Sequence, residues 1–211
     1  MLREIETVKY NLCGADDYQV LPTAEIRFST GQGERLVVCR QCGLVYLNPR
    51  WTEASYRDFY QAEYREGVRD PAAATLSKAE RQQRLLCDIQ QRGAHVVEFR
   101  RDFVCPNDRV LEMGCSNGDI LRSFQLADYA DLMGVKPNPA ESQFAREALE
   151  LNVITGDAHF QSESFALILI VASIVHFLDP LSYLCEMRKL CKPAGYLYVN
   201  TADQIEYTKL S

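Results

Sequence analysis

The sequence predicts an α/β protein with a doubly wound, mostly parallel sheet, preceded by a small N-terminal β ribbon. From residue 109 onward, strand-like and helix-like segments alternate, which is the pattern of a parallel sheet covered by helices on both faces. The run Ala166-Leu-Ile-Leu-Ile-Val171 is continuously apolar, as a strand buried on both faces should be. Residues 10–50 instead contain short β-like runs separated by Gly, Pro and Asp.

Composition limits the classes of function. The 211 residues are enough for one sizeable domain and a small appendage, and 47% of them are hydrophobic, which supports a buried core. A net charge of −6 argues against a broad nucleic-acid-binding surface. No apolar run is long enough to span a membrane, and the first residues lack the apolar region of a signal peptide. We therefore predict a cytoplasmic protein, without nucleic-acid or membrane partners, in which disulfides are the less favoured state of the 8 cysteines.

Three of these cysteines lie in the first 50 residues in a metal-site pattern. Cys39-Arg-Gln-Cys-Gly43 has the spacing of a knuckle that presents two thiolates to one metal ion. Asn11-Leu-Cys-Gly14 matches the second half of another knuckle, with Tyr10 in place of its first cysteine. We therefore predict a zinc-ribbon-like segment over residues 1–50, with Cys13, Cys39 and Cys42 as metal ligands and a neighbouring His or Asp, or water, as the fourth. The alternative is a vestigial ribbon that is held by its own small core and binds no metal.

The next segment, residues 51–104, is predicted to be a helical linker region. Thr52–Tyr60 has the composition of a short helix that Thr52 or Ser55 could cap. Leu76–Gln91 has helical apolar spacing, with Leu85, Leu86 and Ile89 on one face. Gly93 is expected to interrupt this pattern.

The last segment, residues 105–211, is predicted to form the main sheet. Strands are expected at residues 109–113, 132–135, 152–154, 165–172 and 196–200, and helices at 119–127, 139–149 and 180–190. The first strand leads into Gly114-Cys-Ser-Asn-Gly118, where two glycines let a ligand approach the backbone and the next helix begins with unpaired N–H groups. A strand, glycine turn and helix in this order suit a nucleoside-containing cofactor in a Rossmann-like fold; the alternative is an ordinary strand-to-helix turn.

Further segments extend this pattern into a family resemblance. Ile154-Thr-Gly-Asp-Ala158, Phe165-Ala-Leu-Ile168, Val175-His-Phe-Leu-Asp-Pro180 and Lys192-Pro-Ala-Gly-Tyr-Leu-Tyr198 follow the glycine turn. With Glu112-Met-Gly-Cys-Ser-Asn-Gly118 as motif I, they resemble the class I S-adenosylmethionine (SAM) dependent methyltransferases. The ribbon and the tyrosine-rich segment after it resemble a subgroup with an N-terminal zinc-binding segment.

The resemblance implies SAM as the cofactor, zinc in the ribbon and a small-molecule substrate. The residues that it implies for the SAM site are Glu112, Gly114, Cys115, Ser116, Gly118, Lys136 and Asp157. His176 follows the fourth strand, at the edge of the sheet where ligands bind in open α/β folds, and is the candidate catalytic base. The alternative is a structural histidine whose partners are backbone groups.

Several residues depart from the family pattern. Lys136 stands where the family has an acid that accepts both ribose hydroxyls, and a lysine side chain has no acceptor. It could also turn to solvent or pair with Asp157. Ala166 and Val175 replace an Asp and a Glu of the pattern. These changes suggest an impaired enzyme, and they keep two alternatives open: a non-catalytic methyltransferase-like binding module, and a metal-binding scaffold that depends on a partner.

The chain also ends soon after the fifth strand. The predicted core is therefore C-terminally truncated and lacks the family's last two strands. This leaves the fifth strand near an uncovered sheet edge, so either the sequence is a fragment, or a partner or second copy of the chain covers that edge.

Overall fold

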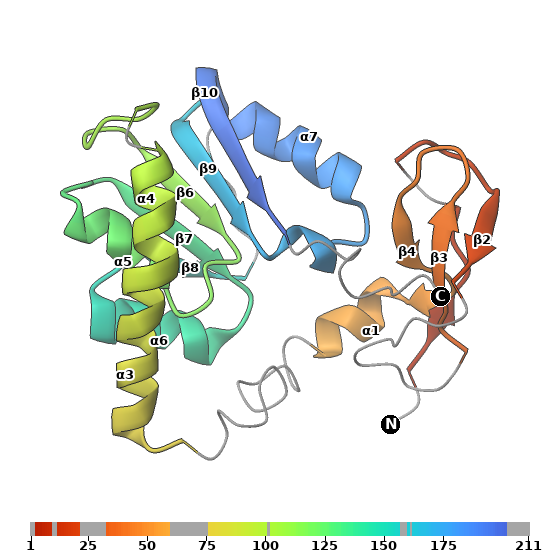
Figure 1. Ribbon diagram of the computed structural model, residues 1–211, viewed down its shortest axis with the longest axis horizontal. Helices are drawn as coiled ribbons and strands as arrows, with labels where there is room; N and C mark the ends of the chain where they lie inside the picture. The colour runs from red at the N-terminus through yellow and green to blue at the C-terminus, as the bar shows by residue number, and fades with distance from the viewer. Residues whose placement is uncertain are drawn as a thin grey trace. The chain divides into compact units, whose positions relative to one another are not determined.

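The computed structural model describes residues 3–9, 12–21, 33–59, 76–100, 102–156, 160 and 162–201. The chain divides into two compact units (Figure 1). Unit 1 comprises Met1–Phe59, Phe177–Tyr183 and Ala202–Ser211, and unit 2 comprises Tyr60–His176 and Leu184–Thr201. We describe each unit by itself.

Unit 2 contains a parallel sheet of five strands in the order β10-β9-β6-β7-β8. Its strands are β6 (Val110–Met113), β7 (Leu132–Lys136), β8 (Val153–Thr155), β9 (Phe165–Val171) and β10 (Cys191–Asn200). The order of the strands reverses at β6, so the carboxyl end of β6 is the topological switch point at which open α/β folds bind ligands. The predicted Rossmann-like sheet is confirmed.

The helices that follow these strands also match the predicted alternation. They are α5 (Asp119–Leu126), α6 (Pro139–Leu149) and α7 (Pro180–Leu190), the last of which begins in the stretch assigned to unit 1. Asn138 caps α6, because its Oδ1 accepts a hydrogen bond from the backbone N–H of Glu141 at 3.1 Å. The first residue of β10 is Cys191 rather than the expected Tyr196, since β10 pairs with β9 on both sides of an irregularity between these two residues.

The core of unit 2 surrounds β9. Its residues Phe165 to Ile170 are all buried, as the apolar run predicted, and α5 contributes Leu121 and Phe124. Burying a side chain of this size contributes roughly 1.5–3 kcal/mol to stability. The sheet that carries the glycine turn is therefore firmly anchored.

A long helical stretch precedes the sheet. It consists of α3 (Lys78–Asp88), a π-helical segment (Ile89–Gly93) and α4 (Ala94–Arg100). The interruption expected at Gly93 is the end of the π-helical segment, after which the chain continues as α4; Gly93 also allows a close approach to α5, since a Cβ there would lie 1.8 Å from Ser123 Oγ. Ile89 is buried as predicted, but Leu86 is 47% exposed, so the expected apolar face was wrong at that position.

Unit 1 contains two small antiparallel sheets, which confirm the predicted N-terminal ribbon. One consists of β2 (Tyr18–Val20), β3 (Leu36–Cys39) and β4 (Val45–Leu47), and in the other β1 (Ile5–Glu6) pairs with β5 (Arg50–Trp51). The short helix α1 (Glu53–Asp58) follows, and Thr52 caps it as predicted, with Oγ1 accepting from the backbone N–H of Ser55 at 3.4 Å.

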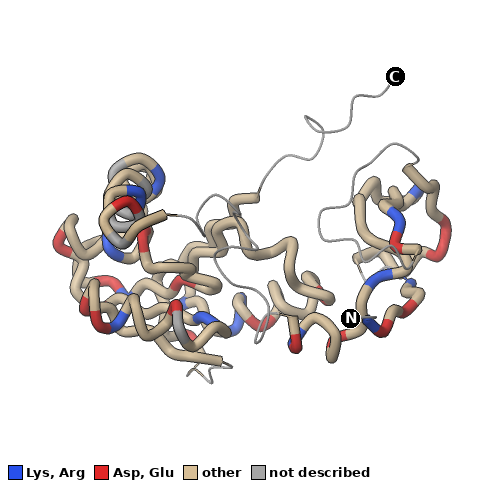
Figure 2. Tube along the Cα trace, turned by 90° about the horizontal axis from the view of Figure 1, so that it is seen from below, with Lys and Arg blue, Asp and Glu red and all other residues tan. Residues whose placement is uncertain are grey.

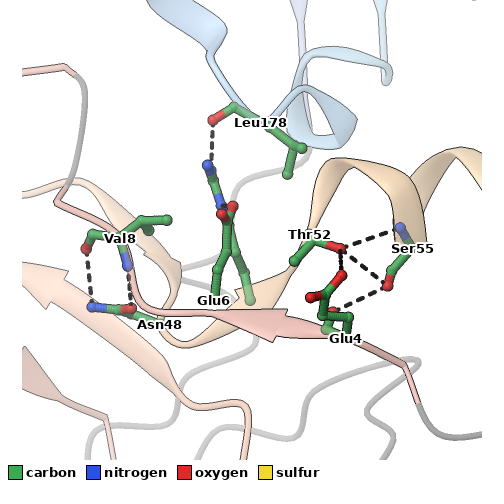
Figure 3. A network of polar contacts seen from close by, with 8 residues as sticks. Glu4, Glu6, Val8, Asn48, Thr52, Ser55 and Leu178 are labelled. Carbon is green, nitrogen blue, oxygen red and sulfur yellow. Dashed lines mark hydrogen bonds and ion pairs between the residues drawn. The ribbon is translucent and has the colours of Figure 1, made fainter.

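Polar contacts tie the first residues of the chain to this unit (Figure 3). The buried side chain of Asn48 bonds to both the backbone N–H and the backbone carbonyl of Val8, at 3.1 and 3.2 Å. Arg50 Nε lies 3.1 Å from Glu6 Oε1, and its Nη1 donates to the carbonyl of Leu178 at 2.6 Å. One arginine therefore connects β1 with the 177–183 stretch of the same unit.

Acidic and basic residues are interspersed along the described traces of both units (Figure 2). Within the described ranges, none of the helices combines the length and the apolar character needed to cross a bilayer.

Candidate functional site

The turn after β6 is the centre of the candidate cofactor site. Gly114, Ser116 and Gly118 all adopt the left-handed conformation, with φ values of 79°, 47° and 83°. The backbone N–H groups of Gly114 and Cys115 donate to the carbonyl of Val135 at 2.9 and 3.2 Å. These bonds fix the turn to β7, so it has one defined shape at the switch point of the sheet.

The two glycines of this turn are also packed against the protein itself. A Cβ at Gly114 would lie 2.8 Å from Ser173 Cβ, and a Cβ at Gly118 would lie 2.6 Å from Leu151 Cδ1. Ser173 Oγ donates to the carbonyl of Met113 at 2.9 Å, which holds the end of β9 against the end of β6. The sequence indicates only that these glycines let a ligand approach the backbone; the contacts show that the fold requires them as well.

Glu112 is buried at the base of the turn. It accepts a hydrogen bond from the backbone of Leu121, while its Oε2 has no hydrogen-bond partner among the described residues. Burial, followed by the nearby carboxylate of Asp119, raises the pKa of Glu112 to about 8, against the opposing effect of Arg92 and other groups. The carboxyl of Glu112 is therefore protonated at neutral pH and has unused hydrogen-bonding capacity.

Cys115 belongs to the predicted site, but its thiol is fully buried. The sulfur fills the space beside Gly134 of β7, where a Cβ would lie 2.7 Å away from it. Burial raises the pKa of this thiol, which therefore stays protonated. Only the backbone of Cys115 is available to a ligand.

Lys136 ends β7, as predicted, and has a partner that sequence reasoning missed. Its Nζ lies 2.7 Å from Glu141 Oε2 in the first turn of α6, and the two side chains are 11% and 15% exposed. The carbonyl of Lys136 accepts hydrogen bonds from the backbone N–H of Gly156 at 3.1 Å and from Ser142 Oγ at 3.2 Å. The other expected partner, Asp157, lies outside the described residues. A glutamate three residues after a helix cap was the sequence signal that could have identified Glu141.

His176 lies at the same edge of the sheet as the turn. It ends the short 3₁₀ turn Ile174–His176 after β9, and its backbone N–H donates to the carbonyl of Ser173 at 3.0 Å. Its side chain is exposed. Because Ser173 itself contacts Gly114, the histidine belongs to the segment that borders the glycine turn.

The three cysteines of unit 1 converge. The Sγ atoms of Cys13, Cys39 and Cys42 all lie within 4.8 Å of one another, and those of Cys13 and Cys39 are 3.6 Å apart. The glycines that follow Cys13 and Cys42 have similar left-handed φ values of 71° and 77°, so the two loops have related shapes. Such a group of sulfurs can hold a zinc ion.

The surroundings of these sulfurs also suit a metal site. The backbone N–H of Cys42 makes the largest contribution to lowering the pKa of Cys39, and that of Gln41 adds to it. Among the residues that the structure describes, no His, Asp or Glu joins the cluster. Tyr10 lies outside the described residues.

Comparison with known proteins is consistent with this geometry. Residues 111–199 match the family model described as a methyltransferase domain. A ubiquinone biosynthesis O-methyltransferase of Cereibacter sphaeroides is 31% identical over 120 residues, which are 51% of this chain and 48% of that protein. An uncharacterized methyltransferase of Schizosaccharomyces pombe is 27% identical over 117 residues, 48% of this chain and 42% of that protein. The chain thus spans about half the length of the curated relatives it matches.

A solved structure shows the same fold. It is a putative SAM-dependent methyltransferase from Methanococcus maripaludis, with a TM-score of 0.50 and 15% identity, covering 58% of this chain and 60% of that one. The family match begins in β6 and ends in β10, so it leaves the cysteine-containing segment outside.

Proposed function

We propose that this chain binds SAM and transfers its methyl group to a small molecule, because residues 111–199 match the family model of a methyltransferase domain. The observation that carries the proposal is the position of the glycine turn. It follows the central strand, at the point where the strand order reverses, inside the segment that matches the family.

The residues of the site fit such a cofactor. The buried Oε2 of Glu112 has no hydrogen-bond partner among the described residues, and α5 begins at the turn with its N–H groups. By the resemblance, the Gly114–Gly118 backbone, with Ser116, binds the cofactor, and Asp157 binds its adenine. Bound SAM supplies a methyl group activated by a sulfonium.

The acceptor that we propose is a hydroxyl group. One relative is named as an O-methyltransferase, and a hydroxyl must lose its proton when it is methylated. His176 is exposed at the edge of the sheet, where it can take this proton. Holding the two substrates close together supplies much of the catalysis in a direct displacement.

Calorimetric titration of the purified chain with SAM tests the cofactor, and formation of S-adenosylhomocysteine with phenols and catechols tests the reaction. We expect His176→Asn to lower the turnover number at least 100-fold while changing the SAM dissociation constant less than twofold. His95→Asn, another exposed histidine, is the control and should change neither quantity. A chain that does not bind SAM contradicts the proposal.

The second candidate is a non-catalytic binding module, which the replacement at Lys136 favours. A lysine at that position removes an acceptor from the cofactor site. SAM binding with no S-adenosylhomocysteine formed from any acceptor would support this candidate over the enzyme.

We also propose that Cys13, Cys39 and Cys42 bind a structural zinc ion, as in the methyltransferase subgroup with a zinc ribbon. The convergence of their sulfurs supports this proposal. A thiolate zinc site of this kind suits a reducing compartment such as the cytoplasm, where disulfides are rare. A zinc content near one ion per chain after purification is the expected result. If the purified chain contains no zinc, the alternative of a vestigial ribbon without metal is favoured.

We also propose that a partner or a second copy of the chain covers the edge of the sheet at β10. β10 is the last strand in the order of the described sheet, and Tyr196, Leu197 and Val199 on it are exposed. Light scattering coupled to gel filtration would detect a dimer, and Leu197→Lys should then shift it to a monomer.

A further inference from the structure

The carboxyl end of β7 carries an unusual arrangement of charge. In dinucleotide-binding sheets, an acid about 20 residues after the glycine turn accepts hydrogen bonds from a ribose hydroxyl. Lys136 occupies this place, and a lysine has donors only. The Glu141 carboxylate nevertheless lies 2.7 Å from its ammonium group. An acid is thus present at this place, although it comes from α6.

Local contacts hold the backbone that carries this carboxylate in position. The backbone N–H of Glu141 bonds to the capping side chain of Asn138 at 3.1 Å. Ser142 Oγ donates to the carbonyls of Lys136 and Asn138, at 3.2 and 2.9 Å. A carboxylate in the first turn of a helix is also stabilised by the helix dipole. The connection from β7 to α6 is therefore rigid, and Glu141 cannot move far from Lys136.

The pair also lies close to the glycine turn, because the backbone N–H groups of Gly114 and Cys115 bond to the carbonyl of Val135, the neighbour of Lys136 in β7, at 2.9 and 3.2 Å. Because the two charges cancel, the pair has no net repulsion for a cationic ligand, which an unpaired lysine would have. The two oxygens of a carboxylate offer about four acceptor positions, so the ion pair leaves several of them for a ligand.

We propose that Glu141, oriented by Lys136, is the acceptor for the ribose hydroxyls of the cofactor, in place of an acid at the end of β7. This inference rests on the proposed SAM binding. The lysine acts as a positioning residue, and the glutamate is the group that touches the ribose.

The test uses ligands with and without the hydroxyls. SAM, adenosine and 2′,3′-dideoxyadenosine are titrated into the full chain and into Glu141→Gln, with adenosine and its analogue measured by competition with SAM. We expect the variant to bind SAM and adenosine about tenfold or more weakly, because charge-assisted hydrogen bonds are lost. Its affinity for dideoxyadenosine should change less than twofold. Glu147→Gln is the control, since Glu147 is an exposed glutamate on the same helix.

A charge exchange provides a second, independent measurement. Lys136→Glu alone places two carboxylates side by side and should weaken SAM binding. The double variant Lys136→Glu/Glu141→Lys restores one acid and one lysine, and should return the affinity to within about threefold of the original, since the ion pair is rebuilt. Circular dichroism verifies that each variant is folded, and if Glu141→Gln does not fold, the double variant decides.

The outcomes separate this inference from the function on which it rests. If the unmodified chain binds SAM and Glu141→Gln binds it equally well, the inference is wrong and the function stands. If Glu141→Gln loses affinity equally for adenosine and dideoxyadenosine, Glu141 is a structural residue and the inference is also wrong. If the unmodified chain binds neither SAM nor adenosine, both fail.

Discussion

The buried carboxyl of Glu112 makes the stability of unit 2 depend on pH in an unusual direction. Burial and the neighbouring Asp119 carboxylate raise its pKa from 4.5 to about 8 in the folded chain. Between these two values the folded state keeps a proton that the unfolded state has released. The contribution of Glu112 to stability is therefore complete below pH 4.5 and is lost as the pH rises through 8.

The size of the effect follows from the two pKa values. Each pH unit within this window changes the free energy of unfolding by up to about 1.4 kcal/mol, so the loss between pH 5 and pH 7 is roughly 2–3 kcal/mol. Glu112→Gln retains the shape and the hydrogen-bonding groups but cannot lose a proton. We expect the difference in unfolding free energy between the original chain and this variant to change by that amount over this range.

Urea unfolding followed by circular dichroism, at pH 5, 6, 7 and 8, measures this difference. Glu147→Gln serves as the control, because Glu147 is exposed on α6 and its replacement should leave the pH dependence unaltered. If the curves for Glu112→Gln and for the original chain run parallel to within about 0.5 kcal/mol, Glu112 is not the group that titrates, and the reasoning fails.

Further predictions concern the turn, the sulfur cluster and unit 1. Gly114→Ala should destabilise the protein by about 1–3 kcal/mol in thermal unfolding, because the backbone of Gly114 is left-handed and a Cβ there would lie against Ser173. Adding Ser173→Gly removes only the contact, so it should restore only part of the lost stability. Cys39→Ser should lower the zinc content measured by mass spectrometry, whereas Cys87→Ser, outside the cluster, should leave it unchanged. In Arg50→Lys the charge is kept, but a lysine cannot contact both Glu6 and the carbonyl of Leu178. The unfolding free energy of unit 1 should therefore fall by about 1 kcal/mol. An unchanged midpoint of thermal unfolding would contradict this.

Much of the fold could be predicted because its signals are local. The apolar run of β9 and the proline at the start of α6 each identify an element from neighbouring residues alone. Gly93 was harder, because its role depends on Ser123, which is 30 residues away in the sequence and packs against it only in the folded chain. Local spacing cannot separate a helix break from a close approach between two helices.

The candidate site shows the same limit. The three cysteines could be selected from their spacing and from the glycines that follow Cys13 and Cys42, and their sulfurs do converge. The sequence shows only that Lys136 stands where the family has an acid, and it suggests Asp157 as a partner. In the structure Lys136 pairs with Glu141 instead, so an acid at position 136 would face a second acid. Which oppositely charged residue a lysine selects depends on the path of the backbone, and this path is set by the cap of α6.

The burial of Cys115 makes the glycine turn measurable by chemical labelling. Cys42, Cys105 and Cys185 are exposed and should react at once with a thiol reagent, whereas the sulfur of Cys115 is reached only when the turn leaves Gly134. The modification rate at Cys115, followed by peptide mass spectrometry, therefore counts openings of this one turn without any engineered probe. A small molecule that binds there slows the labelling in proportion to its occupancy, which gives a way to search for ligands of the site before any reaction is known.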